Sequence, residues 1–95
     1  MKKREFEIAT LPAAWESRLR SVRFGQTVAH CLEVHDLIIS KLAAGRLKDL
    51  EFVGALVHFE MTDLRLLRRR IGQLLLPKDR IKVRARLKSV LDDLG

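Results

Sequence analysis

The sequence is short of the residues that build disulfides, zinc sites and membrane spans. Its one cysteine, Cys31, cannot form an intrachain disulfide and has no second thiol with which to hold zinc. We therefore expect Cys31 to be a small packed residue. The longest apolar runs, 37–39 and 74–76, fall far short of the roughly 20 residues that a transmembrane helix needs. No apolar stretch follows the basic start at 1–4, so we expect a cytoplasmic protein that does not associate with membranes.

The chain is rich in apolar and charged residues, which make up 47% and 33% of its 95 positions. These fractions are typical of a folded protein, and the length fits one domain covering residues 1–95. The net charge of +7 would attract polyanions such as nucleic acid or nucleotide phosphates. It would equally keep a small protein in solution, and composition alone leaves both interpretations open.

A change of hydrophobic period divides the chain into an extended part, 1–34, and a helical part, 35–95. Residues 1–10 are charged and without periodicity, which predicts either a frayed terminus or an added edge strand. Between 18 and 34, apolar residues recur at alternate positions on both sides of Gly25-Gln26-Thr27, which predicts a β-hairpin. We expect His30 to lie on the apolar face of its strand, as a hydrogen-bonded core or boundary histidine rather than a ligand.

Apolar residues at helical spacing predict four helices in the rest of the chain. Their expected ranges are about 36–44, 46–58, 63–75 and 79–94. Gly45 is placed to end the first helix because glycine reaches the left-handed conformation without steric cost. Thr62 is the expected N-cap of the third helix, and Pro77 interrupts the pattern before the fourth. The hairpin and helices together predict an α+β fold that is mainly helical.

The outer faces of the last two predicted helices are strongly basic. The residues that we expect to form a surface for a polyanion are Arg65, Arg68, Arg69, Lys82 and Arg86. No helix-turn-helix pattern accompanies them, and the chain has no tyrosine on which bases could stack. A solvated face is therefore the competing interpretation.

Three charged residues occupy helix positions where apolar residues are expected. On a helical wheel, Lys41 falls between Leu37 and Ile38, while Arg46 and Asp49 lie on the apolar side of the second predicted helix. A lysine can extend out of such a position, and Arg46 and Asp49 are spaced to form an ion pair. Because burying an ion pair seldom stabilises more than apolar residues would, a binding role is the alternative.

The same stretch carries a recognisable pattern, Asp36-Leu37, Ser40-Lys41-Leu42, Ala44-Gly45-Arg46 and Lys48-Asp49-Leu50, preceded by Leu11-Pro12, Trp15-Glu16 and Arg18-Leu19. This pattern resembles nucleotidyltransferase-like families related to abortive-infection toxins, within the DNA polymerase β-like superfamily. The resemblance covers roughly residues 11–56. It implies that Lys41 and Arg46 bind nucleotide phosphates, and that Asp49 serves as a polar organiser or a base.

The resemblance also implies a magnesium site whose residues this sequence does not contain. In those families the metal is held by a Gly-Ser segment, an Asp-x-Asp pair and a further strand carboxylate, and neither Gly-Ser nor Asp-x-Asp occurs here. Nucleotidyl transfer needs carboxylates that converge on a divalent metal. We therefore expect no metal site and no enzyme activity from this chain alone. It looks like the C-terminal half of such an enzyme, starting at its own Met1.

Three interpretations follow. The first is a non-autonomous C-terminal module, which either acts with a separately encoded catalytic half that supplies carboxylates for nucleotide and Mg²⁺ or persists as an inactive relic. The alternative is a basic helical binding module for nucleic acid or an acidic protein partner. A homodimer is the third, because the surface where an absent half would pack favours self-association.

Overall fold

The computed structural model describes residues 10–95, which form a hairpin followed by four α-helices. In chain order the elements are η1 (Trp15–Arg18), β1 (Arg20–Phe24), β2 (Thr27–Cys31), α2 (Val34–Ala44), α3 (Leu47–His58), α4 (Leu64–Ile71) and α5 (Pro77–Asp93). The predicted α+β, mainly helical fold is confirmed. The expectation of a frayed terminus or edge strand falls almost wholly on residues 1–9, outside the described part. No described helix is long and apolar enough to cross a membrane.

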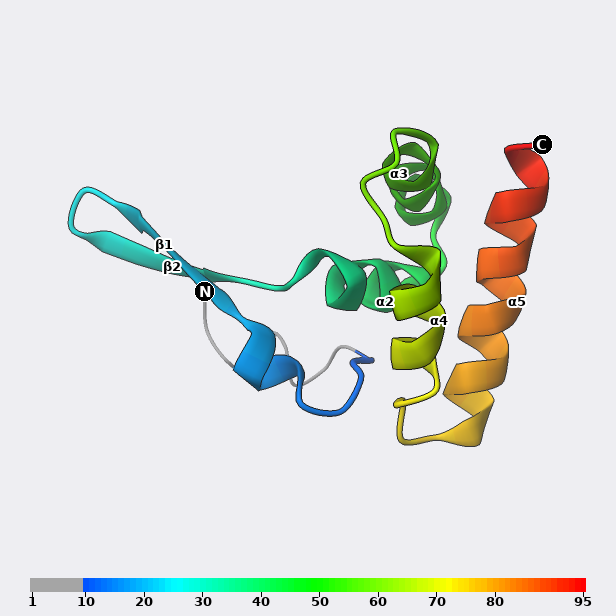
Figure 1. Cartoon of the computed structure of the whole chain (residues 1–95), viewed down its shortest axis with the longest axis horizontal. Coiled ribbons are helices and arrows are strands. Elements are labelled where there is room, and N and C mark those ends of the chain that lie inside the picture. The colour runs from blue at the N-terminus through cyan, green and yellow to red at the C-terminus, as the bar shows by residue number, and fades with distance from the viewer. Residues whose placement is uncertain (1–9) are drawn as a thin grey trace.

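The hairpin extends from one side of the molecule, and the helices gather on the other (Figure 1). Strands β1 and β2 are antiparallel, with Phe24 opposite Thr27 and Arg20 opposite Cys31. The turn between them has two residues, and Gly25 has a φ of 61° there, which suits the first central position of a type II′ turn. The predicted hairpin is therefore confirmed, and Gly25 explains the position of its turn.

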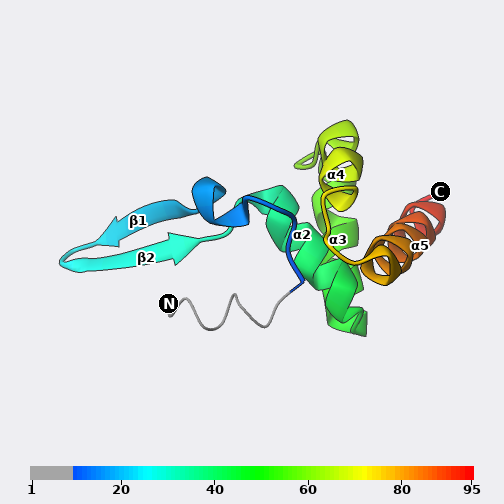
Figure 2. The same ribbon diagram turned by 90° about the horizontal axis from the view of Figure 1, so that it is seen from below.

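The hairpin does not bury the residues that its alternating pattern predicts to be buried. Every residue of β1 is exposed, and in β2 only Ala29 is half-buried. The expectations that His30 lies on a core face and that Cys31 is packed are both wrong, since both side chains are exposed. His30 instead contacts Ser21 across the strands, with 3.2 Å between Nδ1 and Oγ. The reason is tertiary, because the hairpin extends away from the helices (Figure 2).

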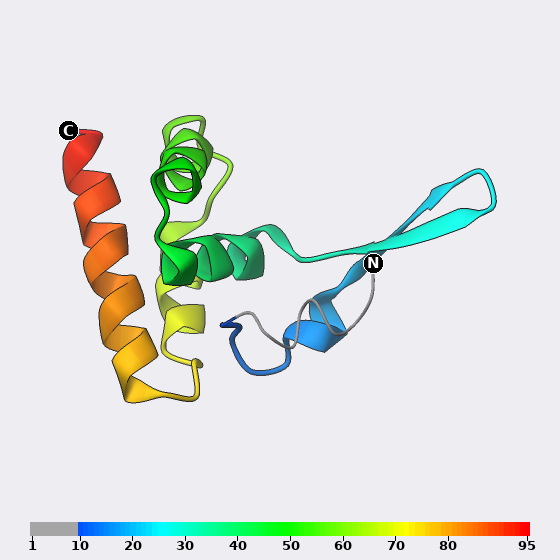
Figure 3. The same cartoon turned by 180° about the vertical axis from the view of Figure 1, so that it is seen from behind.

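Helix α2 is the centre of the core. Its residues Ile38, Ile39 and Leu42 are fully buried and pack against the other three helices. The helix begins after Glu33, whose side chain accepts hydrogen bonds from the backbone N–H groups of the first turn, and it ends at Gly45 with a φ of 69°. Seen from behind, α2 leads from the hairpin into the helical part, and α5 lies on the far side (Figure 3). The predicted glycine stop is confirmed.

The later helix boundaries differ from the predicted ones at three points. The N-cap of α4 is Asp63, whose carboxylate accepts from the backbone N–H groups of Arg65 and Leu66. Thr62 Oγ1 is buried and has no hydrogen-bond partner among residues 10–95. Helix α4 ends at Ile71, earlier than predicted, because the chain turns there toward α5. Pro77 begins α5, since its fixed φ and missing N–H suit the first turn of a helix.

Candidate functional site

The three misplaced charges predicted from the sequence lie together, at the junction of α2 and α3. Lys41 is in the last turn of α2, Arg46 is the N-cap of α3, and Asp49 is in the first turn of α3. The left-handed turn at Gly45 joins the two helices. Arg46 Nε lies 2.7 Å from Asp49 Oδ2, and Lys41 Nζ lies 3.7 Å from Asp49 Oδ1. We call these three residues the Asp49 cluster.

The carboxylate of the Asp49 cluster lies beneath its two cations. Asp49 is 2% exposed, whereas the side chains of Lys41 and Arg46 are 35% and 61% exposed. The hydrogen bond from Arg46 is the main reason why the pKa of Asp49 is held below its ordinary value. A carboxylate with a lowered pKa is a weak base at neutral pH, so this geometry favours the role of organiser over that of base. The ion pair expected from spacing is present, and it leaves both cations open to solvent.

A second and larger group of charges was not predicted from the sequence. Asp36 is fully buried, and Arg18 donates two hydrogen bonds to it, of 2.8 Å from Nε and 2.9 Å from Nη2. Arg70 Nη1 of α4 lies 3.5 Å from the same carboxylate and also pairs with Glu33. This Asp36 cluster therefore ties the segment before the hairpin and helix α4 to the start of α2. Its side chains are engaged with one another, which is typical of a structural network.

His35 completes the Asp36 cluster. Its Nδ1 lies 2.7 Å from Glu33 Oε2, and its Nε2 accepts a hydrogen bond of 3.0 Å from the backbone N–H of Asp63. Since Nε2 accepts, Nδ1 is the ring nitrogen that donates to Glu33. Burial works to raise the pKa of Glu33, but the hydrogen bond from His35 and the charge of Arg70 outweigh it and hold that pKa below its ordinary value. His35 thus joins the start of α2 to the start of α4.

The sequence contained part of the signal for the Asp36 cluster. Arg18 and Asp36 both belong to the pattern that carries the family resemblance. Asp36 also precedes the buried Ile39 by three positions, so the two share one side of the helix. Arg70, in contrast, is the last of three consecutive arginines, and nothing local separates it from its exposed neighbour Arg69.

The residues present do not fit a magnesium ion. Within residues 10–95, no three His, Cys, Asp or Glu side chains come together as a metal site. Asp49 lies between two cations that would repel a divalent metal, and Asp36 is enclosed by arginines. The carboxylates on which nucleotidyl transfer depends are therefore not assembled by the described part of this chain.

The predicted polyanion surface is partly rearranged. Arg65, Arg68, Arg69 and Lys82 are exposed, and Lys82 lies 3.8 Å from Asp79. Arg86 does not face solvent as expected, because its Nη1 donates to the backbone carbonyl oxygens of Leu42 and Ala43 at the end of α2. Arg68 lines a groove of about 480 Å³ between α4 and α5 with two cations outside the predicted set, Arg84 and Lys88. The other lining residues are Leu87, Leu91 and Asp92.

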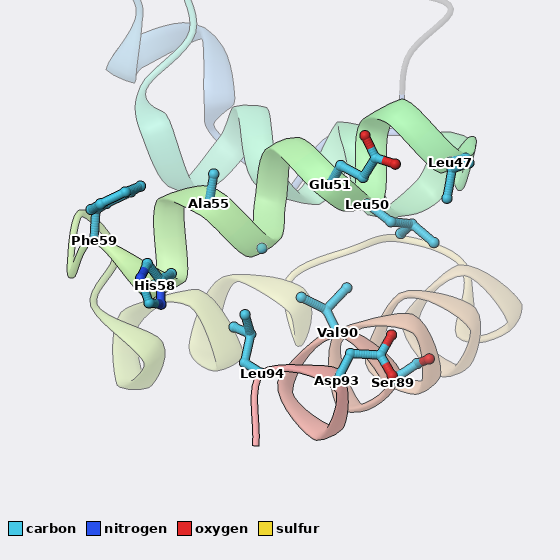
Figure 4. A pocket seen from close by; sticks show the side chains of 11 residues that line it. Leu47, Leu50, Glu51, Ala55, His58, Phe59, Ser89, Val90, Asp93 and Leu94 are labelled. Atoms are coloured by element: carbon cyan, nitrogen blue, oxygen red, sulfur yellow. The ribbon is translucent and has the colours of Figure 1, made fainter.

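An apolar groove of about 480 Å³ runs between α3 and α5 (Figure 4). Leu47 and Leu50 line it on one side and Val90 and Leu94 on the other, with the Glu51 carboxylate at its edge. Among the residues that the structure describes, no lysine or arginine lines this groove, and no member of the Asp49 cluster does. It therefore lacks the cations that a nucleotide phosphate needs.

Comparison with known families agrees with the class of protein that the sequence pattern indicates. Residues 1–89 match the family described as nucleotidyltransferase of unknown function (DUF6036), and the chain belongs to this family. No curated protein and no solved structure matches the chain.

Proposed function

We propose that this chain is a cytoplasmic, non-autonomous C-terminal module of a nucleotidyltransferase. In this proposal Lys41 and Arg46 bind nucleotide phosphates, Asp49 orients them, and a separately encoded half supplies the carboxylates for magnesium. The observation that carries it is the Asp49 cluster, in which a buried carboxylate holds two solvent-accessible cations. The resemblance to families related to abortive-infection toxins supports the same assignment.

The electrostatics of the Asp49 cluster suit a phosphate. Two cations and one anion leave a net positive charge, so the cluster can accept a further anion. The guanidinium of Arg46 can donate to two phosphate oxygens at once, and Lys41 adds a compact charge beside it. The N-terminus of α3 begins at this point, and its dipole also favours an anion. Asp49 reduces the freedom of both cations before a ligand arrives, which lowers the entropic cost of binding.

Catalysis in this proposal depends on a partner. The chain contains neither the Gly-Ser segment nor the Asp-x-Asp pair that hold the metal in the families it resembles. The chain alone is therefore inactive, and a second polypeptide with those motifs would complete the site. If the two proteins form no complex when they are co-expressed, the partner is ruled out, and the chain is then an inactive relic.

Nucleotide binding tests the role of the Asp49 cluster directly. Titration calorimetry with ATP and GTP, without metal, should show binding that weakens by about tenfold or more in Lys41→Ala and in Arg46→Ala, because each loses a charge-assisted contact. Lys48→Ala is the matched control, since Lys48 is an exposed cation on the same helix turn and should have little effect. Asp49→Asn should also weaken binding if the carboxylate organises the cations.

The same titration can contradict the assignment. If Lys41→Ala and Asp49→Ala bind nucleotide as tightly as the unmodified chain, the phosphate-binding role is wrong. Tighter binding by Asp49→Asn would show that Asp49 only neutralises the two cations. If Lys48→Ala loses as much nucleotide affinity as Lys41→Ala, the binding depends on the overall positive charge and not on the Asp49 cluster.

The groove between α4 and α5 favours a second candidate function, the binding of nucleic acid through its phosphate backbone. Arg68, Arg84 and Lys88 reach one groove from two helices. Binding to mixed-sequence single-stranded RNA should then weaken steeply as salt rises. In the double variant Arg68→Ala with Arg84→Ala, the slope of log affinity against log salt should be shallower by the amount that about two phosphate contacts contribute. Arg23→Ala, which removes an exposed cation from the hairpin, is the control. No binding at low salt would exclude this function.

A further inference from the structure

We infer that two copies of this chain pair through the free edge of strand β2. The pairing forms a four-stranded antiparallel sheet from two hairpins around a twofold axis. It requires neither nucleotide nor a complementary half, so it does not rest on the proposed function.

The first observation is that the hairpin is isolated. Its residues are exposed apart from the half-buried Ala29, and in the described part of the chain the sheet has only two strands. A two-stranded sheet alone is marginally stable in water, and three or more strands with a covered face are normally needed. The hairpin extends away from the helices, so within residues 10–95 neither of its edges is paired with another strand (Figures 1 and 2).

The second observation is that one face of the hairpin is mainly apolar and is not covered by any helix of residues 10–95. The pairing register and the alternation of side chains put Val22 and Phe24 of β1 on the same face as Ala29 and Cys31 of β2, with Arg20 and Thr27 at opposite ends of that face. Phe24 is 65% exposed and Val22 is 39% exposed. Joining two hairpins edge to edge makes this face twice as wide and lets the neighbouring apolar side chains shield one another.

The two edges differ in charge, and the difference selects β2. Strand β1 carries Arg20 and Arg23, so two β1 edges would bring like charges close together. Strand β2, Thr27–Cys31, has no lysine, arginine or proline, and its pairing with β1 is unbroken by a bulge. Charged side chains, prolines and bulges are the features that protect exposed strand edges from pairing, and β2 lacks all three. The β2 edge is therefore the unprotected one, and a second β2 edge is free of repelling charge.

The register of the pairing follows from the turn. A two-residue turn makes its flanking pair, Phe24 and Thr27, hydrogen-bonded, and the bonded pairs then alternate along the ladder. Val28 and His30 belong to the non-hydrogen-bonded pairs of the hairpin. Their backbone N–H and C=O groups therefore point away from β1, toward the outer edge of β2. A twofold axis at Ala29 brings Val28 opposite the partner's His30 and His30 opposite the partner's Val28. Four backbone hydrogen bonds then form, with Ala29 facing the partner's Ala29.

The size of this contact sets its strength. Two five-residue strands bury much less than the roughly 1,600 Å² of a standard protein interface. We therefore expect a dimer with a dissociation constant in the micromolar range or weaker, formed at high local concentration. A covalent trap is the appropriate test for such a contact.

A cysteine at the twofold axis supplies that trap. At Ala29 the two Cα atoms would lie about 4.5 Å apart as a non-hydrogen-bonded pair, within the range that a disulfide spans. Ala29→Cys in a Cys31→Ser background should form a disulfide-linked dimer in a glutathione redox buffer. Val22→Cys in the same background is the matched control, because it lies on the same face but one strand away from the edge, and it should form little dimer.

A second measurement keeps the test independent of cysteine chemistry. The unmodified chain should show a concentration-dependent dimer in sedimentation equilibrium, and Ala29→Lys should shift it to monomer because two lysines would face each other. Far-UV circular dichroism checks that the helices remain folded. Equal cross-linking of Ala29→Cys and Val22→Cys would overturn the inference. A dimer that persists in Ala29→Lys would place the contact elsewhere, and a monomer at millimolar concentration would exclude it.

Discussion

Replacing Asp36 by Asn tests whether the Asp36 cluster holds the fold together. Asp36 is fully buried and receives two short hydrogen bonds from Arg18, with Arg70 beside it. The substitution keeps the shape of the side chain but removes its negative charge. Arg18 then loses its paired carboxylate where water has limited access, since its side chain is only 21% exposed. Arg70, at 13% exposed, is left with Glu33 as its remaining partner.

The expected loss is large for a domain of this size. Breaking a buried ion pair from one side costs about 3 to 5 kcal/mol, and the partial exposure of Arg18 places this case near the lower end. A 95-residue domain has a total stability of roughly 5 to 14 kcal/mol, so Asp36→Asn removes a substantial part of it. At about 4 to 8 °C per kcal/mol, the melting temperature should fall by roughly 12 to 24 °C.

Urea unfolding followed by circular dichroism at neutral pH measures this loss. Asp92→Asn makes the same chemical change in the exposed pair with Lys88 and should alter stability by less than about 0.5 kcal/mol. Arg18→Ala should destabilise strongly as well, because it leaves Asp36 with one partner. A loss below about 1 kcal/mol in Asp36→Asn would refute the view that this network stabilises the fold.

Three further predictions follow from the same geometry. The pKa of Glu33 is lowered in the folded chain, so the stability that its carboxylate confers is complete above its ordinary pKa of about 4.3 and is lost as pH falls through the folded-state pKa. The urea midpoint should therefore fall on acidification, and Glu33→Gln should make that midpoint less dependent on pH. Gly45→Ala should cost about 1 to 2 kcal/mol or more in thermal unfolding, because Gly45 has a positive φ and the Arg86 guanidinium occupies the space of a Cβ. Asp63→Ala should cost about 1 kcal/mol through the lost N-cap. Thr62→Ala should cost less, because Thr62 Oγ1 has no hydrogen-bond partner within residues 10–95.

The sequence by itself determined the local elements. Gly25 and the alternating residues around it define the hairpin, and Gly45 ends α2, because each depends only on the conformations open to neighbouring residues. The pairing of Arg46 with Asp49 was also predictable, since residues three apart on a helix are neighbours. Lys41 could be singled out by its place on the wheel, but its distance from Asp49 depends on how α2 and α3 meet.

Only the tertiary structure decided which charges are structural and which face solvent. Arg70 reaches Asp36 across 34 positions, and Arg86 reaches Leu42 across 44, so no local pattern distinguishes them from the exposed Arg69 and Lys82. The hairpin shows the converse case, because its alternation predicts a buried face that no helix of residues 10–95 covers. The physical reason is the same in both: burial and ion pairing depend on which elements meet in space, and sequence periodicity specifies only the face that each element presents.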